Sequence, residues 1–386
     1  MKASPVDKSA PDAVLLKSGP EFFGVLMDLI DKAESEIHLQ TYILEDDVTG
    51  RKVINAIKKA ASAGIKVYIL ADAYGSKNLP DKVISELMDS GIQFRKFSPA
   101  GRFTKLFLGK RLHHKVLVTD GRHCLVGGIN IADRYSGFDG GETWLDYAIY
   151  IKGTAAKRVQ RICVRLFFRH RFNPLKNWRG KFNRIRKIFK TKHTIVAFND
   201  WYRQHFEISH TYRLALRNVK SEAIILASYF LPSVRIMRLL RKASKRGVTI
   251  KIILPANTDV PLFNYTSKFL YEWMLKNKIE IYEYQPGMLH AKCALMDNDF
   301  LTVGSFNFIS LSEYGSVEMN INIFKGEIIN TARKEFERVM ETDCHLVTRE
   351  HFARRPFISR LLDRLAFYFV RAGMRLYLFF STDDES

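Results

Sequence analysis

One short pattern of histidine, lysine and aspartate, HxKxxxxD, occurs twice in the sequence, at residues 113–120 and at residues 290–297. In both places a second segment, Gly-(Gly or Ser)-x-Asn, begins seven residues after the aspartate. From average residue frequencies, one such combination has a chance probability on the order of 10⁻⁵ in a chain of this size, so two with identical spacing are not a coincidence. The catalytic residues that the pattern predicts are His113, Lys115, Asp120, His290, Lys292 and Asp297.

Histidine and lysine two positions apart suit chemistry on a phosphodiester. In a strand, His113 and Lys115 point to one face while His114 points to the other. By the same alternation, His290 and Lys292 point to one face of their strand. The ammonium groups balance the charge of the non-bridging oxygens and of the transition state. One neutral imidazole can attack phosphorus, and the other, protonated, can give its proton to the leaving oxygen. We expect no metal or other cofactor, because the fixed cations supply the electrostatic stabilisation.

The small residues and amides after each pattern are candidates for substrate binding, because glycine lets the backbone approach closely and an asparagine amide donates hydrogen bonds. The substrate-binding residues predicted on this basis are Gly128, Asn130, Ser305 and Asn307. Each histidine also needs an acceptor that orients its second nitrogen. Asp146 and Glu318 are the candidates, since each lies in a strand-like run shortly after its asparagine.

Neighbouring residues have plainer interpretations. His114 and His123 are expected to be ordinary neighbours rather than catalytic groups. Tyr42 and Tyr229 occupy equivalent strand ends, where they either line the cleft or pack in the core.

The elements around the patterns also repeat. A basic amphipathic helix is expected at residues 51–63 and again at 233–246, and each ends at a glycine, Gly64 or Gly247. An apolar strand follows each helix. Alternation of strands with helices of 10–15 residues is typical of a layered α/β domain. Two such copies packed face to face would bring both patterns to a shared pocket.

The chain length of 386 residues suits two or three domains. The predicted organisation is a tail at 1–13, a first domain at 14–200, a second domain at 201–350 and an amphipathic helix that associates with membranes at 351–386.

These motifs resemble the phospholipase D superfamily, whose signature is the duplicated HxKxxxxD pattern, over roughly residues 14–345. Five further short segments are similar to the short bacterial cardiolipin synthases of the B type, namely residues 45–47, 71–76, 241–247, 294–297 and 302–305. The resemblance implies an α/β fold of two tandem phospholipase D-like α/β/α sandwich domains, with mixed sheets and pseudo-twofold symmetry.

The resemblance also implies an activity, the joining of two phosphatidylglycerol molecules with release of glycerol. His113 would take the phosphatidyl group as a phosphohistidine. His290 would protonate the departing glycerol and then deprotonate the incoming hydroxyl. In the family the two aspartates of the pattern are more structural than chemical, and Asp146 stands where the family often has glutamate.

Charge distinguishes this chain from an ordinary soluble protein. Sixty-one Lys and Arg against forty Asp and Glu give a net charge of +21, which implies a polyanionic partner such as an anionic membrane surface or nucleic acid. The four cysteines lie far apart, so neither a disulfide framework nor a zinc site is expected. The N-terminus is no signal peptide, and no run of 18 uncharged apolar residues predicts a spanning helix.

Three basic segments are candidates for membrane contact. Residues 147–199 contain fifteen Lys and Arg and no acidic residue, and 102–111 form a basic insertion before the first pattern. On a helix over 357–380, Arg360, Arg364, Arg371 and Arg375 fall within about 60° of arc on an otherwise apolar surface. The alternatives are a solvated charged face at 147–199 and packing of the C-terminal helix on the catalytic body.

The function predicted is that of a cardiolipin synthase at the cytoplasmic face of the cell membrane, peripheral to the bilayer, with phosphatidylglycerol as partner and no nucleic acid. The oligomeric state stays open. Alternatives are a phospholipase D-type hydrolase of phospholipids, a phospholipase D-family nuclease that the charge would suit, and a membrane scaffold with an inactive site. The basic runs are mixed with Phe, Leu and Ile more than with stacking Tyr or Trp, which disfavours the nuclease.

Overall fold

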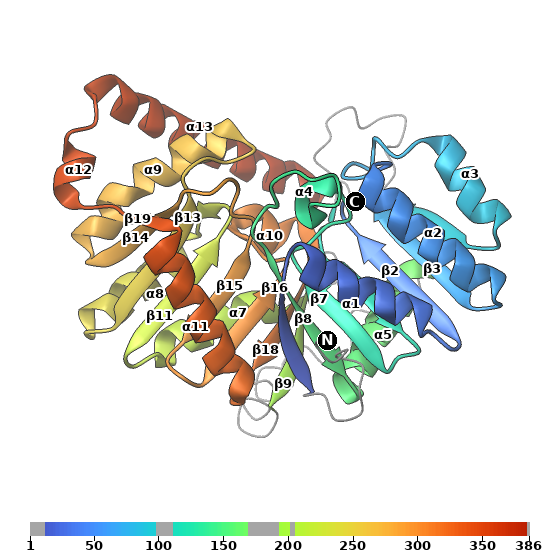
Figure 1. Ribbon diagram of the computed structural model, residues 1–386. Coiled ribbons are helices and arrows are strands. Elements are labelled where there is room, and N and C mark those ends of the chain that lie inside the picture. Colours follow the sequence, from blue (N-terminus) through green and yellow to red (C-terminus); the bar gives the residue numbers. More distant parts are fainter. Residues whose placement is uncertain (1–11, 98–110, 169–192, 201–204, 384–386) are drawn as a thin grey trace.

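The structure, a computed structural model, describes residues 12–97, 111–168, 193–200 and 205–383. Two mixed β-sheets, one from each half of the chain, lie side by side with helices packed on them (Figure 1). This arrangement confirms the predicted α/β fold of two tandem units.

The first sheet has seven strands in the order β1-β8-β7-β6-β2-β3-β4. Their bounds are β1 (Ala13–Lys17), β2 (Glu36–Thr41), β3 (Lys66–Asp72), β4 (Gln93–Phe97), β6 (Lys115–Thr119), β7 (His123–Gly127) and β8 (Tyr147–Lys152). The strands β2, β3 and β4 are parallel, and the others pair antiparallel. The helices of this half are α1 (Pro20–Asp31), α2 (Val48–Ser62), α3 (Asp81–Asp89), α4 (Asp133–Ser136) and α5 (Thr154–Phe167).

The second sheet repeats this plan in the order β10-β9-β18-β16-β15-β11-β13-β14-β19. Its strands are β9 (Thr194–Asp200), β10 (His205–Phe206), β11 (Glu222–Ala227), β13 (Thr249–Pro255), β14 (Ile279–Tyr284), β15 (Lys292–Met296), β16 (Phe300–Gly304), β18 (Ser316–Ile323) and β19 (Cys344–Leu346). Two short strands, β12 (Phe230–Leu231) and β17 (Phe308–Ile309), pair with each other. The helices are α7 (Glu207–Asn218), α8 (Val234–Lys245), α9 (Pro261–Lys276), α10 (Ser310–Tyr314), α11 (Glu327–Thr342), α12 (Arg349–Ala353) and α13 (Phe357–Asp383).

The predicted repeat of helix, glycine and strand is confirmed. Helix α2 is followed by Gly64 with φ +88°, and α8 by Gly247 with φ +91°. Only glycine adopts this left-handed conformation without strain, so each helix ends there and the chain turns into β3 or β13. The boundary between the halves needs a correction. Strand β9 pairs with β18 of the second sheet, so residues 194–200 belong to the second half and not to the first.

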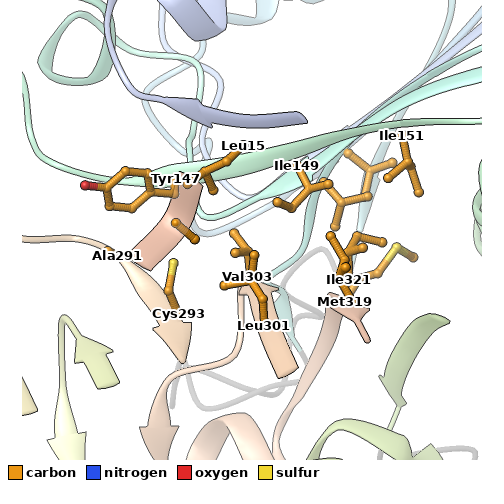
Figure 2. Packing of buried hydrophobic residues seen from close by; sticks show 14 of the residues in the cluster. Leu15, Tyr147, Ile149, Ile151, Ala291, Cys293, Leu301, Val303, Met319 and Ile321 are labelled. Atoms are coloured by element: carbon orange, nitrogen blue, oxygen red, sulfur yellow. The ribbon is translucent and has the colours of Figure 1, made fainter. Parts of the chain in front are cut away.

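An apolar core joins the two halves. Figure 2 shows side chains of β1 and β8, among them Leu15, Ile149 and Ile151, facing Cys293, Val303 and other side chains of β15, β16 and β18. Each fully buried aliphatic side chain of this kind contributes about 1.5–3 kcal/mol, so this core stabilises the packing of one sheet against the other. Helices α5 and α11 belong to the same core, whereas α1 and α2 cover the far face of the first sheet and α7, α8 and α9 that of the second.

The basic segment at 147–199 is partly a buried structural element. Its first part forms β8, which is almost entirely buried, and α5, whose inner face belongs to the core. The predicted lipid contact is centred on residues 165–190 of this segment, of which the structure describes 165–168, and there Leu166 and Phe167 are buried at the end of α5. The remainder from 169 to 192 and the insertion at 102–110 lie outside the described residues. Among the described helices, none is both long and apolar enough to cross a bilayer.

The predicted C-terminal helix is α13, which lies against α9 (Figure 1). Its side chains Phe367, Val370 and Met374 are buried in the core of the second half. Eight large apolar side chains of the same helix are exposed instead, namely Phe357, Ile358, Leu361, Leu362, Leu365, Tyr368, Phe369 and Leu376. Packing of this helix on the catalytic body is thus confirmed for one of its faces, and the other face carries exposed apolar side chains.

Candidate active site

The two copies of the pattern meet because each histidine is bound to the other half of the chain. His113 Nδ1 lies 3.0 Å from Glu318 Oε2, and His290 Nδ1 lies 2.6 Å from Asp146 Oδ2. Both predicted carboxylates therefore lie beside a predicted histidine. The pairing is crosswise, which the sequence left open.

Backbone hydrogen bonds fix the crosswise arrangement for the second histidine. The amide of His290 donates to the carbonyl of Leu145, at 2.8 Å, and the amide of Leu145 donates to Met288, at 2.9 Å. Leu145 immediately precedes Asp146, so the residue that holds the histidine backbone also positions its carboxylate partner.

The first histidine is anchored in the same way. The amides of His113 and His114 both donate to the carbonyl of Val317, at 2.9 Å and 3.0 Å, and Val317 immediately precedes Glu318. Strand β5 (Arg111–Leu112), which leads into the pattern, pairs in parallel with the start of β18. Each histidine is thus fixed in position and in ring orientation by two adjacent residues of the opposite half.

Both lysines are buried at this junction. Lys115 Nζ donates to the carbonyl of His113 at 2.5 Å, and Lys292 Nζ donates to the carbonyl of His290 and lies 3.8 Å from Asp146. Burial and the charge of Lys292 lower the pKa of Lys115 to about 7, and burial lowers the pKa of Lys292 to about 8 against the charges of Asp146 and Glu318. Two buried ammonium groups that repel each other form a site that an anion would stabilise.

The same burial keeps the histidines neutral. Burial lowers the pKa of His113, although Glu318 opposes the shift, and burial together with Lys292 lowers the pKa of His290 well below its usual range. Burial also raises the pKa of Asp146 to about 7. A carboxylate accepts hydrogen bonds, so we expect the proton of each neutral ring on Nδ1 and the lone pair on Nε2. Lys292 Nζ also lies 2.8 Å from Nδ1 of His290, and in this form it donates to the carbonyl of His290 instead. Each Nε2 is then available to attack phosphorus or to carry a proton.

Aromatic side chains surround both rings. Tyr42 packs edge-on against His113, with ring centres 5.1 Å apart, and Lys115 Nζ lies 5.0 Å from the centre of the Tyr42 ring. Around His290 the neighbours are Tyr135, at 5.3 Å, and Trp144, at 5.8 Å. Sequence reasoning missed the last two, because an aromatic residue in a loop carries no position-specific signal until the opposite half is placed against it.

The predicted substrate-binding asparagines have partners inside the protein. Asn130 accepts from the amide of Ile43, at 3.1 Å, and donates to the hydroxyl of Tyr135, at 2.9 Å. Asn307 accepts from the hydroxyl of Ser228, at 2.8 Å. Both amides therefore hold the ends of neighbouring strands in place, and Asn130 also holds a ring that contacts His290.

Gly128 and Ser305 serve the two carboxylates in different ways. A Cβ atom at Gly128 would lie 2.4 Å from Asp146 Oδ2, so the absence of a side chain makes room for the shorter carboxylate. At the equivalent position Ser305 donates its hydroxyl to Glu318. These two predicted residues lie in the site, where they contact the carboxylates.

The two aspartates of the pattern lie elsewhere. Asp120 and Asp297 follow β6 and β15 at the ends remote from the histidines. Asp120 accepts hydrogen bonds from the amides of residues 34, 35 and 36 and from the hydroxyl of Ser35, and Asp297 accepts the same four bonds from residues 220–222. Their inclusion among the catalytic residues is corrected, because they join the start of β2 or β11 to the end of the strand that begins at the lysine, β6 or β15.

The sequence match between Tyr42 and Tyr229 also needs correction. In the two sheets, Gln40 pairs with Val116 and Leu226 pairs with Cys293. Val116 and Cys293 each follow the lysine of their pattern by one residue, so Gln40 and Leu226 are equivalent positions. By this register Tyr42 matches Ser228, and Tyr229 lies one residue further along. A shift of one residue turns the side chain the other way, so the two tyrosines have different surroundings.

A duplicated α/β fold in which two histidines, two lysines and two carboxylates complete one site across the halves defines a phospholipase D-like protein. The sequence matches the family model described as "Cardiolipin synthase, PLD-like domain" over residues 26–162 and 213–340. Cardiolipin synthase B of Salmonella typhimurium is 31% identical over 366 residues, which cover 92% of this chain and 87% of that protein. The protein of the same name from Escherichia coli K12 is 29% identical over 373 residues, with the same coverage. The chain belongs to the cardiolipin synthase family.

Solved structures share the fold at low sequence identity. Phosphatidylserine synthase of Haemophilus influenzae Rd KW20 matches with a TM-score of 0.71 over 94% of both chains, at 15% identity. Polyphosphate kinase of Porphyromonas gingivalis matches with a TM-score of 0.61 over 94% of this chain and 53% of that one, at 13% identity.

Substitution of either carboxylate tests the crosswise pairing. We expect Asp146→Asn and Glu318→Gln each to lower kcat by about 10²-fold or more, because a neutral amide neither fixes the Nδ1–H form of its histidine nor stabilises an imidazolium. Gly128→Ala should act like Asp146→Asn, since its methyl group displaces the carboxylate. Steady-state kinetics with a phosphodiester substrate measure these effects. Unchanged kcat in both carboxylate variants would contradict an orienting role.

Replacement of Asp120 tests the correction of its role. Burial raises its pKa, but four hydrogen bonds outweigh burial and lower the pKa below its usual value. Its ionised form therefore stabilises the fold fully above about pH 4, and this contribution is lost as the pH falls through the lowered pKa. Asp120→Ala should cost about 1–3 kcal/mol in urea unfolding at pH 7 and keep kcat in the folded fraction. The exposed Asp81→Ala is the control, and a loss of kcat at full stability would return Asp120 to the chemistry.

Proposed function

We propose that the protein is a cardiolipin synthase that transfers a phosphatidyl group from one phosphatidylglycerol to another through a phosphohistidine on His113. The observation that carries this proposal is the pair of crosswise contacts from Glu318 to His113 and from Asp146 to His290, which supports two histidines on one phosphorus atom. The names of the relatives, cardiolipin synthase B, support the same reaction.

In the first step, Nε2 of His113 attacks phosphorus, and the bond from phosphorus to the glycerol oxygen breaks. His113 suits the nucleophile because its side chain is 17% exposed against 7% for His290. The departing oxygen takes a proton from His290. The negative phosphodiester offsets the charges of Lys115 and Lys292 that otherwise lower the pKa of His290, so substrate binding itself favours the protonated acid.

In the second step, His290 is neutral and removes the proton from a hydroxyl of the second phosphatidylglycerol. That oxygen attacks phosphorus, and the bond from phosphorus to His113 Nε2 breaks. The products are cardiolipin and glycerol, and both histidines return to their starting forms. The two lysines stabilise the extra negative charge of each transition state.

Product analysis tests the reaction. The purified protein should convert vesicles of phosphatidylglycerol to cardiolipin plus glycerol, as mass spectrometry would resolve. Phosphatidic acid plus glycerol would instead establish the hydrolase, and cleavage of single-stranded DNA without lipid turnover would establish the nuclease.

Variants of the two histidines separate their roles. His113→Ala should abolish turnover together with any acid-labile phosphoenzyme, and His290→Ala should lower turnover by about 10²–10⁴-fold because the general acid is lost. His114→Ala is the neighbouring control for the loss of an imidazole. Normal turnover in either of the first two variants would contradict the mechanism.

We also propose that α13 holds the enzyme on an anionic bilayer at the cytoplasmic face. Its eight exposed apolar side chains alternate with the exposed basic residues Arg360 and Arg364, a combination that suits the lipid interface. Arg371 and Met374 of the helix line a cavity of about 100 Å³ together with residues 231–234 and Ser310, which lie a few residues after Tyr229 and Asn307 in the sequence. Contact with lipid along α13 would therefore bring the headgroups towards the histidines.

Exposed residues of α13 test this attachment. Leu365→Ala with Phe369→Ala should weaken binding to phosphatidylglycerol vesicles by tenfold or more, since each lost insertion removes about 1.5–3 kcal/mol of apolar burial. The fold should be unaffected, because both side chains are exposed. Met88→Ala, an exposed apolar residue on α3, is the matched control in a co-sedimentation assay. Equal binding by the double variant and the control would contradict the proposal.

A further inference from the structure

One carboxylate near the site has no counterpart in the other half. Four residues beyond the end of β3 the chain has Ser76, whose hydroxyl bonds to the backbone of Tyr42 and Leu44. Four residues beyond the end of β13 it has Asp259, which is exposed and accepts a hydrogen bond of 2.5 Å from the hydroxyl of Tyr229. Among the described residues, Asp259 forms no ion pair.

Asp259 lies beside the site on the side of His290. Its partner Tyr229 follows β11, which pairs with the strand of His290, since Ala227 lies opposite Lys292 and the amide of Ser228 donates to Ala291 at 3.1 Å. The negative charge of Asp259 also acts on Lys292, Tyr42 and Tyr135, three residues that surround the two histidines.

A carboxylate at this place does not suit the phosphate of the substrate. Two like charges would repel each other, and the phosphodiester already has two lysines to bind it. The carboxylate and the phenol oxygen of Tyr229 instead offer hydrogen-bond acceptors. They suit a part of the substrate that carries donors and lies on the side where the alcohol leaves and enters.

The charges around the site decide between two kinds of donor. An ammonium headgroup would meet Lys115, Lys292 and Arg134, all of which already lower the pKa of His290 by their positive charge. A neutral polyol meets no such repulsion, and its hydroxyl groups donate well to a carboxylate. The surroundings therefore favour the hydroxyl groups of glycerol.

We propose that Asp259, held by Tyr229, binds the free hydroxyl groups of the glycerol that leaves and of the glycerol headgroup that enters. This inference rests on the proposed function and adds to it the subsite that selects the alcohol. One subsite serves both steps, because the leaving and the entering alcohols have the same chemistry and both exchange a proton with His290.

Competition between two alcohols tests the subsite. Phosphatidylglycerol vesicles are incubated with the enzyme, deuterated glycerol and ethanol, and mass spectrometry gives the ratio of deuterated phosphatidylglycerol to phosphatidylethanol. In each product the alcohol oxygen bonds to phosphorus, the bond to His113 breaks and the alcohol proton passes to His290. Ethanol has no second hydroxyl for Asp259, so the ratio reports recognition of glycerol independently of the first step.

We expect Asp259→Ala to lower this ratio about tenfold or more, because a charge-assisted hydrogen bond to a substrate hydroxyl is lost. Tyr229→Phe should lower it less, since the carboxylate remains but is no longer held. The exposed Asp81→Ala is the matched control and should leave the ratio unchanged. A wild-type ratio in Asp259→Ala would overturn the subsite.

The wild-type enzyme separates the two levels of the proposal. Deuterated phosphatidylglycerol and phosphatidylethanol from the wild-type chain, with an unchanged ratio in Asp259→Ala, would overturn the subsite alone. Neither product from the wild-type chain would overturn the proposed function and the subsite with it.

Discussion

His113 and His290 each form their backbone hydrogen bond and their carboxylate contact with the opposite half of the chain. The rest of the site depends on this constraint. Leu145 and Asp146 hold His290, and Val317 and Glu318 hold His113. Neither half alone can orient its own histidine. The apolar core between the sheets therefore has a direct bearing on chemistry, because a small movement of one half would separate both pairs at once.

The same junction buries several charged groups close together. Lys115 and Lys292 are buried close enough that the charge of Lys292 lowers the pKa of Lys115, and Asp146 is buried with them. Buried charges of this kind persist where the surrounding structure is rigid and a ligand of opposite charge completes the set. An anionic phosphodiester is such a ligand. Its binding would restore the protonated lysines and favour a protonated His290, which couples recognition of the substrate to the readiness of the acid.

Much of this could be predicted from the sequence, because its signals are local. The spacing of His113 and Lys115 places the histidine just before β6, which begins at Lys115, and the glycines after α2 and α8 end those helices. The crosswise pairing could not be predicted, since it depends on the docking of two sheets. The same holds for Tyr135, which reaches His290 only across that junction. Asp120 and Asp297 belong to the pattern, but their four hydrogen bonds became evident only once the strand starts were placed.

The crosswise contacts can be observed directly in histidine-labelled protein by long-range ¹⁵N–¹H NMR, which reports the protonated nitrogen of each ring. Our account predicts the Nδ1–H form for both His113 and His290 at neutral pH. Asp146→Asn should alter the signals of His290 and leave those of His113 in place, and Glu318→Gln should do the reverse. If each substitution instead alters the histidine of its own half, the histidines are oriented within the halves and the account is wrong.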